Sequence, residues 1–246
     1  MLPSQIMRIG PDSISLSSNP GGIQIINSEQ LKSAWTSTSG STLVFYINPK
    51  INDRTGQSGN EYASVVQIGS SQAFQLLVAP DAGRGVSMAP ALLKINIAKT
   101  NPLSSVAPAP EIVEIPNFPL QRWTGVAIVK QGRKFNIYLN GKLAVSHMCN
   151  TMTDFDSTQP LRVGDPRLGG TIEHMSLAPY ALEARAVRDL YRATVDTSGK
   201  PVVSINILSG IKIFIPSLPN HWWCPGGNCS STQGISPLEQ WSSPYG

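Results

Sequence analysis

The sequence predicts an all-β fold, an antiparallel β-sandwich of two sheets, and three observations lead to it. Short segments of alternating apolar and polar residues recur at the spacing expected of a sandwich, each bounded by Gly, Pro, Asn or Asp. The chain also has 20 prolines and 21 glycines, which leave few stretches long enough for a helix. Charged residues make up only 14% of the 246 residues, about half the usual share.

The first half of the chain contains six predicted strands, at residues 23–26, 42–48, 62–68, 73–79, 92–98 and 111–115. After Leu92, apolar and polar residues alternate through Ile97. One face of this strand should therefore pack inward, while Lys94 and Asn96 meet water.

The strongest local pattern predicts two consecutive β-hairpins, from strands at residues 123–130, 134–139 and 142–147. Asn140 and Gly141 lie between the second and third strands. This pair is preferred in a two-residue type I′ turn, because both positions require positive φ. Of Trp123, Val126, Tyr138 and Leu139, those that face inward should form the core between the sheets.

Strands at 161–165 and 171–178 should complete the sandwich, followed by a helix over 183–193. The apolar face of this helix is formed by Leu182, Ala186, Val187, Leu190 and Tyr191. Two further strands are expected at 202–208 and 211–215.

We predict three regions: an N-terminal arm or edge lead-in (1–21), the sandwich (22–215) and a C-terminal docking tail (216–246). The tail is rich in Pro, Gly, Ser and Trp. Prolines lower the entropy lost on docking, and aromatic side chains make strong anchors. We expect the anchors that bind a partner protein to be Trp222, Trp223, Trp241 and Tyr245. The alternative is that these tryptophans cover a sheet of their own chain.

The chain has three cysteines. Cys224 and Cys229 flank the turn sequence Pro-Gly-Gly-Asn, which would let their sulfurs meet in a disulfide. Two free thiols, or half of a zinc site with His221, are the alternatives, and Cys149 is left over.

Two runs carry a resemblance to a known family: NFPLQRWTGVAIVKQGRKFNIYLNGKLAVSH, from Asn117, and LRVGDPRLGGTIEHMSLAPYALEARAVRDLY, from Leu161. They resemble the C-terminal half of a laminin G-like domain of the concanavalin A-like superfamily, in which a strand opening with Trp precedes a Tyr-x-Asn-Gly-x turn. Trp123 and the run 138–142 match these features. The resemblance covers about residues 42–193 and implies a jelly-roll sandwich with one short helix.

The superfamily includes lectins, glycosidases, adhesion modules and structural proteins, so the resemblance leaves the ligand open. The FPLQRW run and the Pro-rich tail are most similar to laminin G-like proteins of large DNA viruses, some of which are virion components of the minor capsid type. Laminin G-like domains also often hold calcium at the sandwich rim. The candidate ligands here are Asp154, Asp156 and Asp165, although Asp-Phe-Asp is also typical of a solvated turn.

Catalytic motifs of the common classes are missing from the sequence. Glycosidases of this fold carry Glu-x-Asp-x-(x)-Glu on one strand, whereas Glu111 and Glu114 should point to opposite faces. Nucleophile-elbow, phosphate-loop and His-Glu-x-x-His patterns are also absent. His147, His174 and His221 lie in separate segments, and His174 should be a structural histidine within a strand. We therefore expect no enzymatic activity.

The 19 Lys and Arg residues are scattered singly and the net charge is +4, so no nucleic-acid partner is expected. No signal peptide is visible, and no apolar run approaches the roughly 18 residues of a spanning helix. We expect the protein in a virion or an intracellular assembly.

Three hypotheses for function follow. The first is a structural protein that contacts other subunits of a large assembly such as a virion capsid. The second is a glycan-binding, lectin-like module, to which Trp35 and the loop around Asp53 could contribute. The third is an atypical glycosidase.

Overall fold

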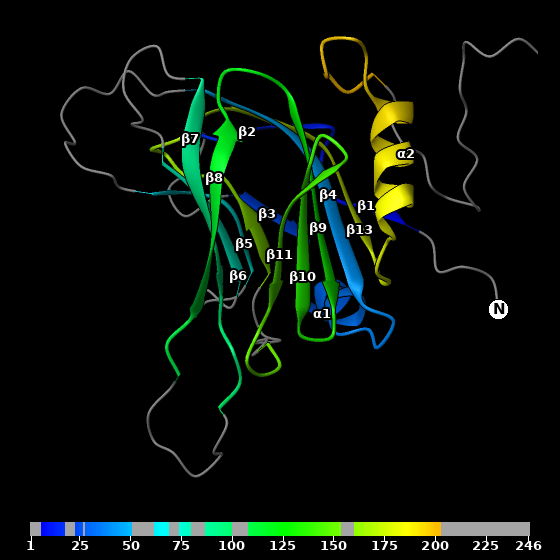
Figure 1. Cartoon of the computed structure of the whole chain (residues 1–246). Helices are drawn as coiled ribbons and strands as arrows, with labels where there is room; N and C mark the ends of the chain where they lie inside the picture. Colours follow the sequence, from blue (N-terminus) through cyan, green and yellow to red (C-terminus); the bar gives the residue numbers. More distant parts are fainter. Residues whose placement is uncertain are drawn as a thin grey trace, which may run out of the picture. The chain divides into compact units, whose positions relative to one another are not determined.

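The structure is a computed structural model of the whole chain (Figure 1). It describes residues 6–17, 23–26, 28–50, 62–68, 74–79, 87–99, 108–153 and 160–202. The chain divides into two units, Met1–Lys212 and Ile213–Gly246. The second unit lies outside the described residues, as do the strands predicted at 211–215 and nearly all of 202–208. The following account concerns the first unit.

Two antiparallel sheets face each other, which confirms the predicted all-β sandwich (Figure 1). The seven-stranded sheet has the order β1-β13-β4-β9-β10-β11, and β2 pairs with β13 off this path. Its strands are β1 (Met7–Arg8), β2 (Ser13–Ser15), β4 (Ser41–Lys50), β9 (Thr124–Gln131), β10 (Lys134–Leu139), β11 (Lys142–Met148) and β13 (Gly169–Ala178). The six-stranded sheet has the order β3-β12-β5-β6-β7-β8. Its strands are β3 (Ile23–Ile26), β5 (Ala63–Ile68), β6 (Phe74–Val78), β7 (Met88–Ile95), β8 (Glu111–Pro119) and β12 (Leu161–Val163).

The main core fills the space between the sheets with aliphatic and aromatic side chains. Among its aromatic residues, three make ring contacts. The Trp35 and Phe74 ring centroids are 5.0 Å apart in an edge-to-face arrangement, and those of Phe74 and Phe135 are 6.1 Å apart and stacked. Alternating burial along β7 and β8 shows that one face of each of these strands packs into this core.

A first helix that the sequence analysis did not predict, α1, spans Ser28–Trp35. Its buried residues Leu31, Ala34 and Trp35 form a stripe at i, i+3 and i+4. The buried Lys130 Nζ donates to the Trp35 carbonyl at 3.2 Å, and desolvation lowers the pKa of this lysine. Only eight residues long, the helix has too short a pattern to be recognised without its partners.

Residues 6–17, which the sequence analysis placed in the N-terminal arm or edge lead-in, belong to the sandwich. Both β1 and β2 pair with β13. Ile9, Ile14 and Leu16 are buried in the main core. Ile14 and Leu16 alternate with serines, a short strand pattern that the sequence analysis did not use, and β13 beside them completes their burial.

The turn between β10 and β11 has φ of 51° at Asn140 and 72° at Gly141, the conformation of a type I′ hairpin. The Gly125 N–H donates to Asn140 Oδ1 at 2.9 Å, and the Asn140 N–H donates to the Gly125 carbonyl at 2.7 Å. These two bonds attach the turn to the first residues of β9.

The second helix, α2 (Ala184–Thr194), packs on the outer face of the seven-stranded sheet (Figure 1). A second apolar cluster lies between them, formed by Val44, Ala127, Val129, Tyr138 and Val187. Tyr138 therefore contributes to this second cluster and not to the space between the sheets. Of the other residues considered for the core, Val126 is buried in the main core between the sheets and Leu139 packs against that core. Trp123 is only half-buried. Within the described part of the chain, neither helix is long and apolar enough to cross a membrane.

Candidate functional sites

One polar cluster lies where the edge strands of the two sheets come together, β8 from one sheet and β11 from the other. Glu111 is the first residue of β8, His147 lies in β11, and Cys149 follows directly after β11. One carboxylate oxygen, one imidazole nitrogen and the thiol sulfur all lie within 4.8 Å of one another. We call these three residues the seam cluster.

Hydrogen bonds hold the Glu111 carboxylate in place. Its Oε2 lies 2.5 Å from His147 Nε2, and its Oε1 accepts the Asn150 N–H at 2.7 Å. Desolvation alone would raise the pKa of Glu111, but the hydrogen bonds from Asn150 and His147 outweigh it and lower the pKa. The carboxylate is therefore ionised at neutral pH.

Cys149 is fully buried at the inner side of the seam cluster. Burial raises the pKa of its thiol to about 11, and the negative charge of Glu111 adds to the effect. The side chains of Glu111 and His147 are 11% and 29% exposed, so the cluster is reached from solvent on their side.

The sequence analysis left Cys149 over and treated His147 as isolated. One signal was available: His147 and Cys149 are two residues apart, which places both side chains on one side of an extended chain. Glu111 lies 36 residues from His147 and belongs to the other sheet, so no local pattern could have added it.

Asp165, a candidate calcium ligand, has both carboxylate oxygens engaged by protein donors. Arg167 donates from Nε to Oδ1 at 3.0 Å and from its terminal nitrogen to Oδ2 at 2.7 Å, and the Ser64 N–H reaches Oδ2 at 3.1 Å. Burial would raise the pKa of Asp165, but these bonds outweigh it and lower the pKa. Asp165 thus ties the loop after β12 to β5. Because Asp154 and Asp156 lie outside the described residues, the calcium site stays a prediction.

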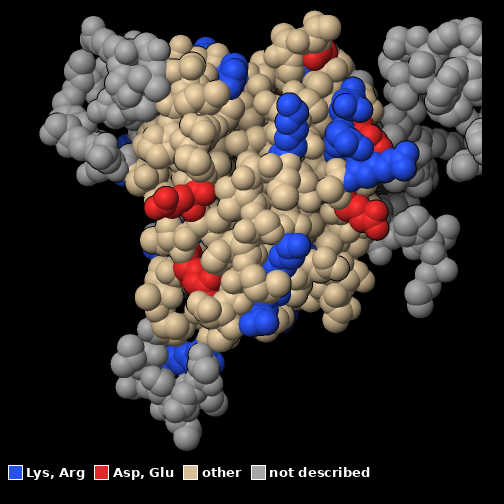
Figure 2. All heavy atoms as spheres, viewed as in Figure 1, with Lys and Arg blue, Asp and Glu red and all other residues tan. Residues whose placement is uncertain are grey.

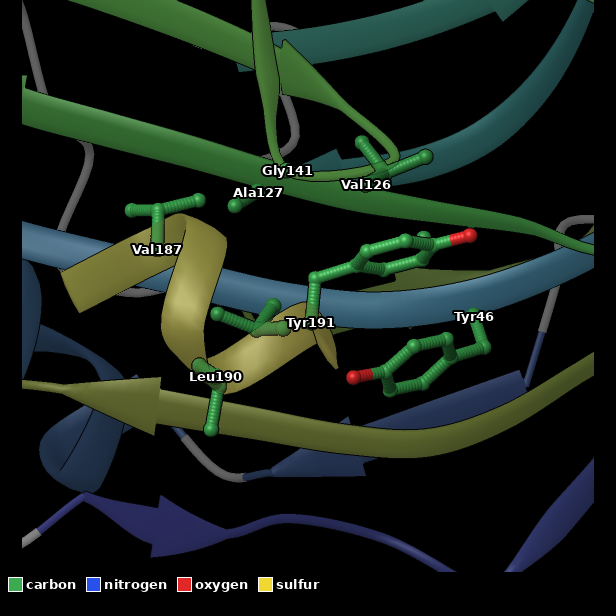
Figure 3. Close-up of a pocket in the computed structure, with 9 residues that line it drawn as sticks. Tyr46, Val126, Ala127, Gly141, Val187, Leu190 and Tyr191 are labelled. Atoms are coloured by element: carbon green, nitrogen blue, oxygen red, sulfur yellow. The ribbon is translucent and has the colours of Figure 1, made fainter. Parts of the chain in front are cut away.

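A small pocket lies between α2 and the seven-stranded sheet, lined mainly by Val44, Tyr46, Gly125, Leu190 and Tyr191 (Figure 3). It offers about 10 Å³ of free space, close to what one water molecule needs. The Thr194 hydroxyl donates to the Leu190 carbonyl, so the Tyr46 hydroxyl donates to Thr194 Oγ1. The pocket is too small for a sugar or a cofactor, and the Tyr46 hydroxyl is already bonded to Thr194.

The outer face of the six-stranded sheet carries a row of side chains from five neighbouring strands. The residues in register are Arg162, Gln67, Gln75, Lys94 and Ile112. Apart from Glu111, their strand neighbours are buried in the main core, so these five point away from it. A second row on the same face consists of Leu77, Leu92 and Glu114. We call the two rows together the outer platform.

The outer platform combines side-chain amides, charges of both signs and aliphatic groups. Gln75 is buried, Ile112 is 57% exposed, and Gln67, Lys94 and Arg162 are half-buried. No helix in the described part of the chain packs on this face. Glu114 belongs to the platform, whereas Glu111 on the same strand faces the seam, so the two carboxylates lie on opposite sides as expected.

Basic side chains gather over α2 on the face that Figure 2 shows. Arg185, Arg188 and Arg192 are exposed on this helix, and Asp189 lies within 4.0 Å of the first two. Most of the remaining visible face carries neither charge (Figure 2). These ion pairs are exposed to solvent, so we interpret this side of α2 as an ordinary solvated helix face.

His174 lies in β13 at an irregularity of the β13–β4 register, with φ of 50°. Its Nδ1 is buried and has no hydrogen-bond partner among the described residues, which differs from the satisfied structural histidine that we expected. Desolvation and the nearby Arg8 charge lower its pKa, so the ring is neutral at pH 7.

Several predicted site residues fall elsewhere. Trp35 is 2% exposed in the main core and cannot stack on a sugar, so that suggestion was wrong. Asp53 lies outside the described residues. So do the tail residues Trp222, Trp223, Trp241 and Tyr245 and the cysteines Cys224 and Cys229, and their roles stay predictions.

No protein-family model matches the sequence, and no curated protein matches it. Solved structures do share its fold. The binding domain of Paraclostridial Mosquitocidal Protein 1 is 14% identical with a TM-score of 0.55, and the match covers 82% of this chain and 50% of that one. The botulinum neurotoxin serotype D binding domain is 13% identical with a TM-score of 0.54, covering 79% of this chain and 46% of that one.

The receptor binding domain of the botulinum neurotoxin C/D mosaic serotype is 13% identical with a TM-score of 0.53, covering 81% of this chain and 50% of that one. This chain thus spans about half the length of the solved domains it matches. At identities this low, the structural similarity shows a shared fold and nothing more specific. None of these three is a virion protein, so the expectation of a viral origin gains no support from them.

Proposed function

We propose that this chain is a non-enzymatic binding module that docks a partner protein on its outer platform. The observation that carries the proposal is the composition of that face. Leu77, Leu92 and the exposed Ile112 supply apolar contact, and charged and amide groups surround them. Apolar residues surrounded by polar ones match the apolar centre and polar rim that many protein-binding surfaces have.

The fold likeness supports a binding role without naming a ligand. The three matched structures are described as binding domains or as a receptor binding domain. A sandwich of this kind offers a rigid sheet on which side chains stand in fixed register, and this lowers the entropy lost on association. Contacts with other subunits of a large assembly, as the sequence analysis expected, would be one form of this role.

A glycan is the second candidate ligand, and the amide of the half-buried Gln67 favours it. A side-chain amide both donates and accepts hydrogen bonds, as sugar hydroxyls require. However, none of the described outer-platform residues is aromatic, and sugar sites commonly stack a ring on an aromatic side chain. Aliphatic groups in this position favour the protein partner.

Two matched substitutions test the outer platform. Ile112 on β8 is 57% exposed and Leu143 on β11 is 55% exposed, so they differ in sheet and hardly in accessibility. We expect Ile112→Asp to weaken capture of the native partner at least tenfold, measured by quantitative cross-linking in the source cells, and Leu143→Asp to leave it unchanged. Equal effects of the two substitutions would remove the platform from the proposal.

Glycan binding is tested on an array with the purified chain. Under the proposal no glycan is bound. Binding that Gln67→Leu weakens and Leu143→Asp spares would establish the second candidate in its place.

The absence of catalysis is tested with β-glucan and galactan substrates. No turnover is expected, because Glu111 and Glu114 lie on opposite sides of β8 and cannot act on one bond. Hydrolysis that is abolished by replacing a single Asp or Glu would overturn the non-enzymatic part of the proposal.

A further inference from the structure

We propose that the seam cluster is a zinc site, in which Glu111, His147 and Cys149 supply three protein ligands and water the fourth. It would join β8 to β11 and so close one side of the sandwich. The three residues come from separate parts of the fold, since Glu111 begins one sheet's edge strand while His147 and Cys149 end the other's.

The donor set selects the metal. One thiolate sulfur, one imidazole nitrogen and one carboxylate oxygen are the three ligand types that Zn²⁺ accepts, whereas Ca²⁺ and Mg²⁺ require oxygen throughout. Zinc sites with three protein ligands and a water are known, although structural zinc sites more often have four protein ligands.

The distances suit a tetrahedral ion with small side-chain adjustments. Ligand atoms around zinc lie roughly 3.3 to 3.8 Å from one another, given metal bonds of about 2.0 to 2.3 Å. The three atoms here lie within 4.8 Å of one another. Glu111 Oε2 and His147 Nε2, now 2.5 Å apart, must separate by about 1 Å to admit the ion, which rotation of two partly exposed side chains allows.

The surroundings order the ligands. The Asn150 N–H holds the second Glu111 oxygen at 2.7 Å, and the Cys149 N–H donates to the Arg133 carbonyl at 2.9 Å. The Arg133 guanidinium would repel a cation, but it donates to the Asn150 carbonyl at 2.8 Å, so it supports the turn that carries the ligands. Bonds of this kind fix ligand orientation in metal sites.

Binding proceeds with a clear balance of protons. The Cys149 thiol loses its proton to solvent as the sulfur–zinc bond forms. His147 Nε2 donates a proton to the ionised Glu111 carboxylate, so this proton must leave Nε2, to solvent from the imidazolium or by a shift to the Nδ1 tautomer, before Nε2 and Oε2 each ligate the ion. Solvent reaches the ion on the side of Glu111 and His147, where the fourth ligand would lie.

Cobalt(II) tests the site, because it replaces zinc and a Co–thiolate bond gives charge-transfer absorption in the near ultraviolet. The full chain is used with Cys224→Ser and Cys229→Ser, so that Cys149 is its one remaining thiol. We expect the thiolate band to appear in this background and to disappear with Cys149→Ser. Without a band in the background, or with a band that survives Cys149→Ser, the proposal is overturned.

Two further substitutions keep the test independent of the buried cysteine. His147→Gln and Glu111→Gln remove partly exposed ligands and should each weaken cobalt binding at least tenfold, whereas Glu114→Gln, on the opposite side of β8, should not change it. Affinities equal to the background for both ligand variants would show that the cluster is only a hydrogen-bonded seam.

Thermal melting gives a second readout. Zinc at about 100 times its dissociation constant should raise the melting temperature of the background chain by about 5 to 10 °C, and calcium should not. A shift of the same size in His147→Gln would place the metal elsewhere in the chain and overturn the assignment.

Discussion

The outer face of the seven-stranded sheet and that of the six-stranded sheet belong to the same sandwich but differ in what they present. Beneath α2, the first face consists of Val44, Ala127, Val129 and Tyr138, all buried. The second presents the outer platform, with half-buried polar groups and an exposed Ile112. A sheet needs one apolar face to form the core between the sheets, and the other face is free to differ.

The difference separates stability from recognition. On the α2 side, side chains are packed to the exclusion of solvent, so substitutions there should act through the free energy of unfolding. On the outer platform, all side chains but that of Gln75 reach solvent, so substitutions of the exposed ones should act on binding and leave the fold intact. The four predictions below test this division, in order of expected effect.

The largest effect is expected for Tyr138→Ala in the second apolar cluster. Tyr138 is 4% exposed, and truncating a buried aromatic side chain commonly costs about 3 to 5 kcal/mol of unfolding free energy. Urea denaturation followed by circular dichroism measures this cost. A loss below about 1 kcal/mol would show that α2 adds little to the sandwich and would break the comparison.

Gly125→Ala should be the next most destabilising change. A Cβ atom at Gly125 would lie 2.7 Å from Tyr191 Cδ2 and 3.2 Å from Tyr46 Cε1, so the aromatic side chains beneath α2 must move. We expect a cost of about 1 to 3 kcal/mol by the same denaturation assay, because overpacking forces neighbours from their rotamers. Gly132→Ala serves as a comparison, because its Cβ would meet no atom within 4 Å while φ is 58°. Its cost measures backbone strain without crowding.

Tyr46→Phe should cost about 1 kcal/mol at neutral pH, the net value of the hydrogen bond to Thr194. Burial raises the pKa of Tyr46 from about 10 to about 12, so the folded state holds the proton more tightly than the unfolded state. The contribution of Tyr46 is therefore fully present below pH 10 and is lost as pH rises toward 12. Denaturation at several pH values should show a shallower alkaline decline for Tyr46→Phe than for the wild type, and identical slopes would contradict the assignment.

The smallest effect on stability is expected for Ile112→Ser on the outer platform. With 57% of this side chain exposed, the unfolding free energy should change by less than about 0.5 kcal/mol. The same denaturation assay measures it, with Leu143→Ser as the matched control. A cost above about 2 kcal/mol would mean that Ile112 is packed in the folded protein and that the two faces are more alike than we infer.

Local patterns predicted much of the sandwich. The alternating runs located β4 and β5 within a few residues, and the apolar spacing from Leu182 to Tyr191 located α2. The Asn-Gly pair lies at a turn with positive φ at both positions. In these segments the signal lies within one element, because periodicity and turn chemistry are local properties.

Other elements carried a shorter or weaker local signal. The strands β1 and β2 have two and three residues, and their apolar neighbours become buried only because β13 lies beside them. Helix α1 is a similar case. The sequence does not show that Trp35 is buried, because its ring contact with Phe74 comes from a distant strand. The alternation around Tyr138 predicts a buried strand residue. Only the position of α2 shows that Tyr138 is buried on the outer face of its sheet, beneath the helix.

The sequence by itself therefore determined the fold class, the strand periodicity, the hairpin turn and the amphipathic helix, because each depends on residues close together in the chain. Only the tertiary structure decided which face of each sheet is covered, and it brought Glu111 to His147 and Cys149. Glu111 and His147 are 36 residues apart in the chain and lie on edge strands of different sheets. Their contact therefore follows from how the two sheets pack on each other.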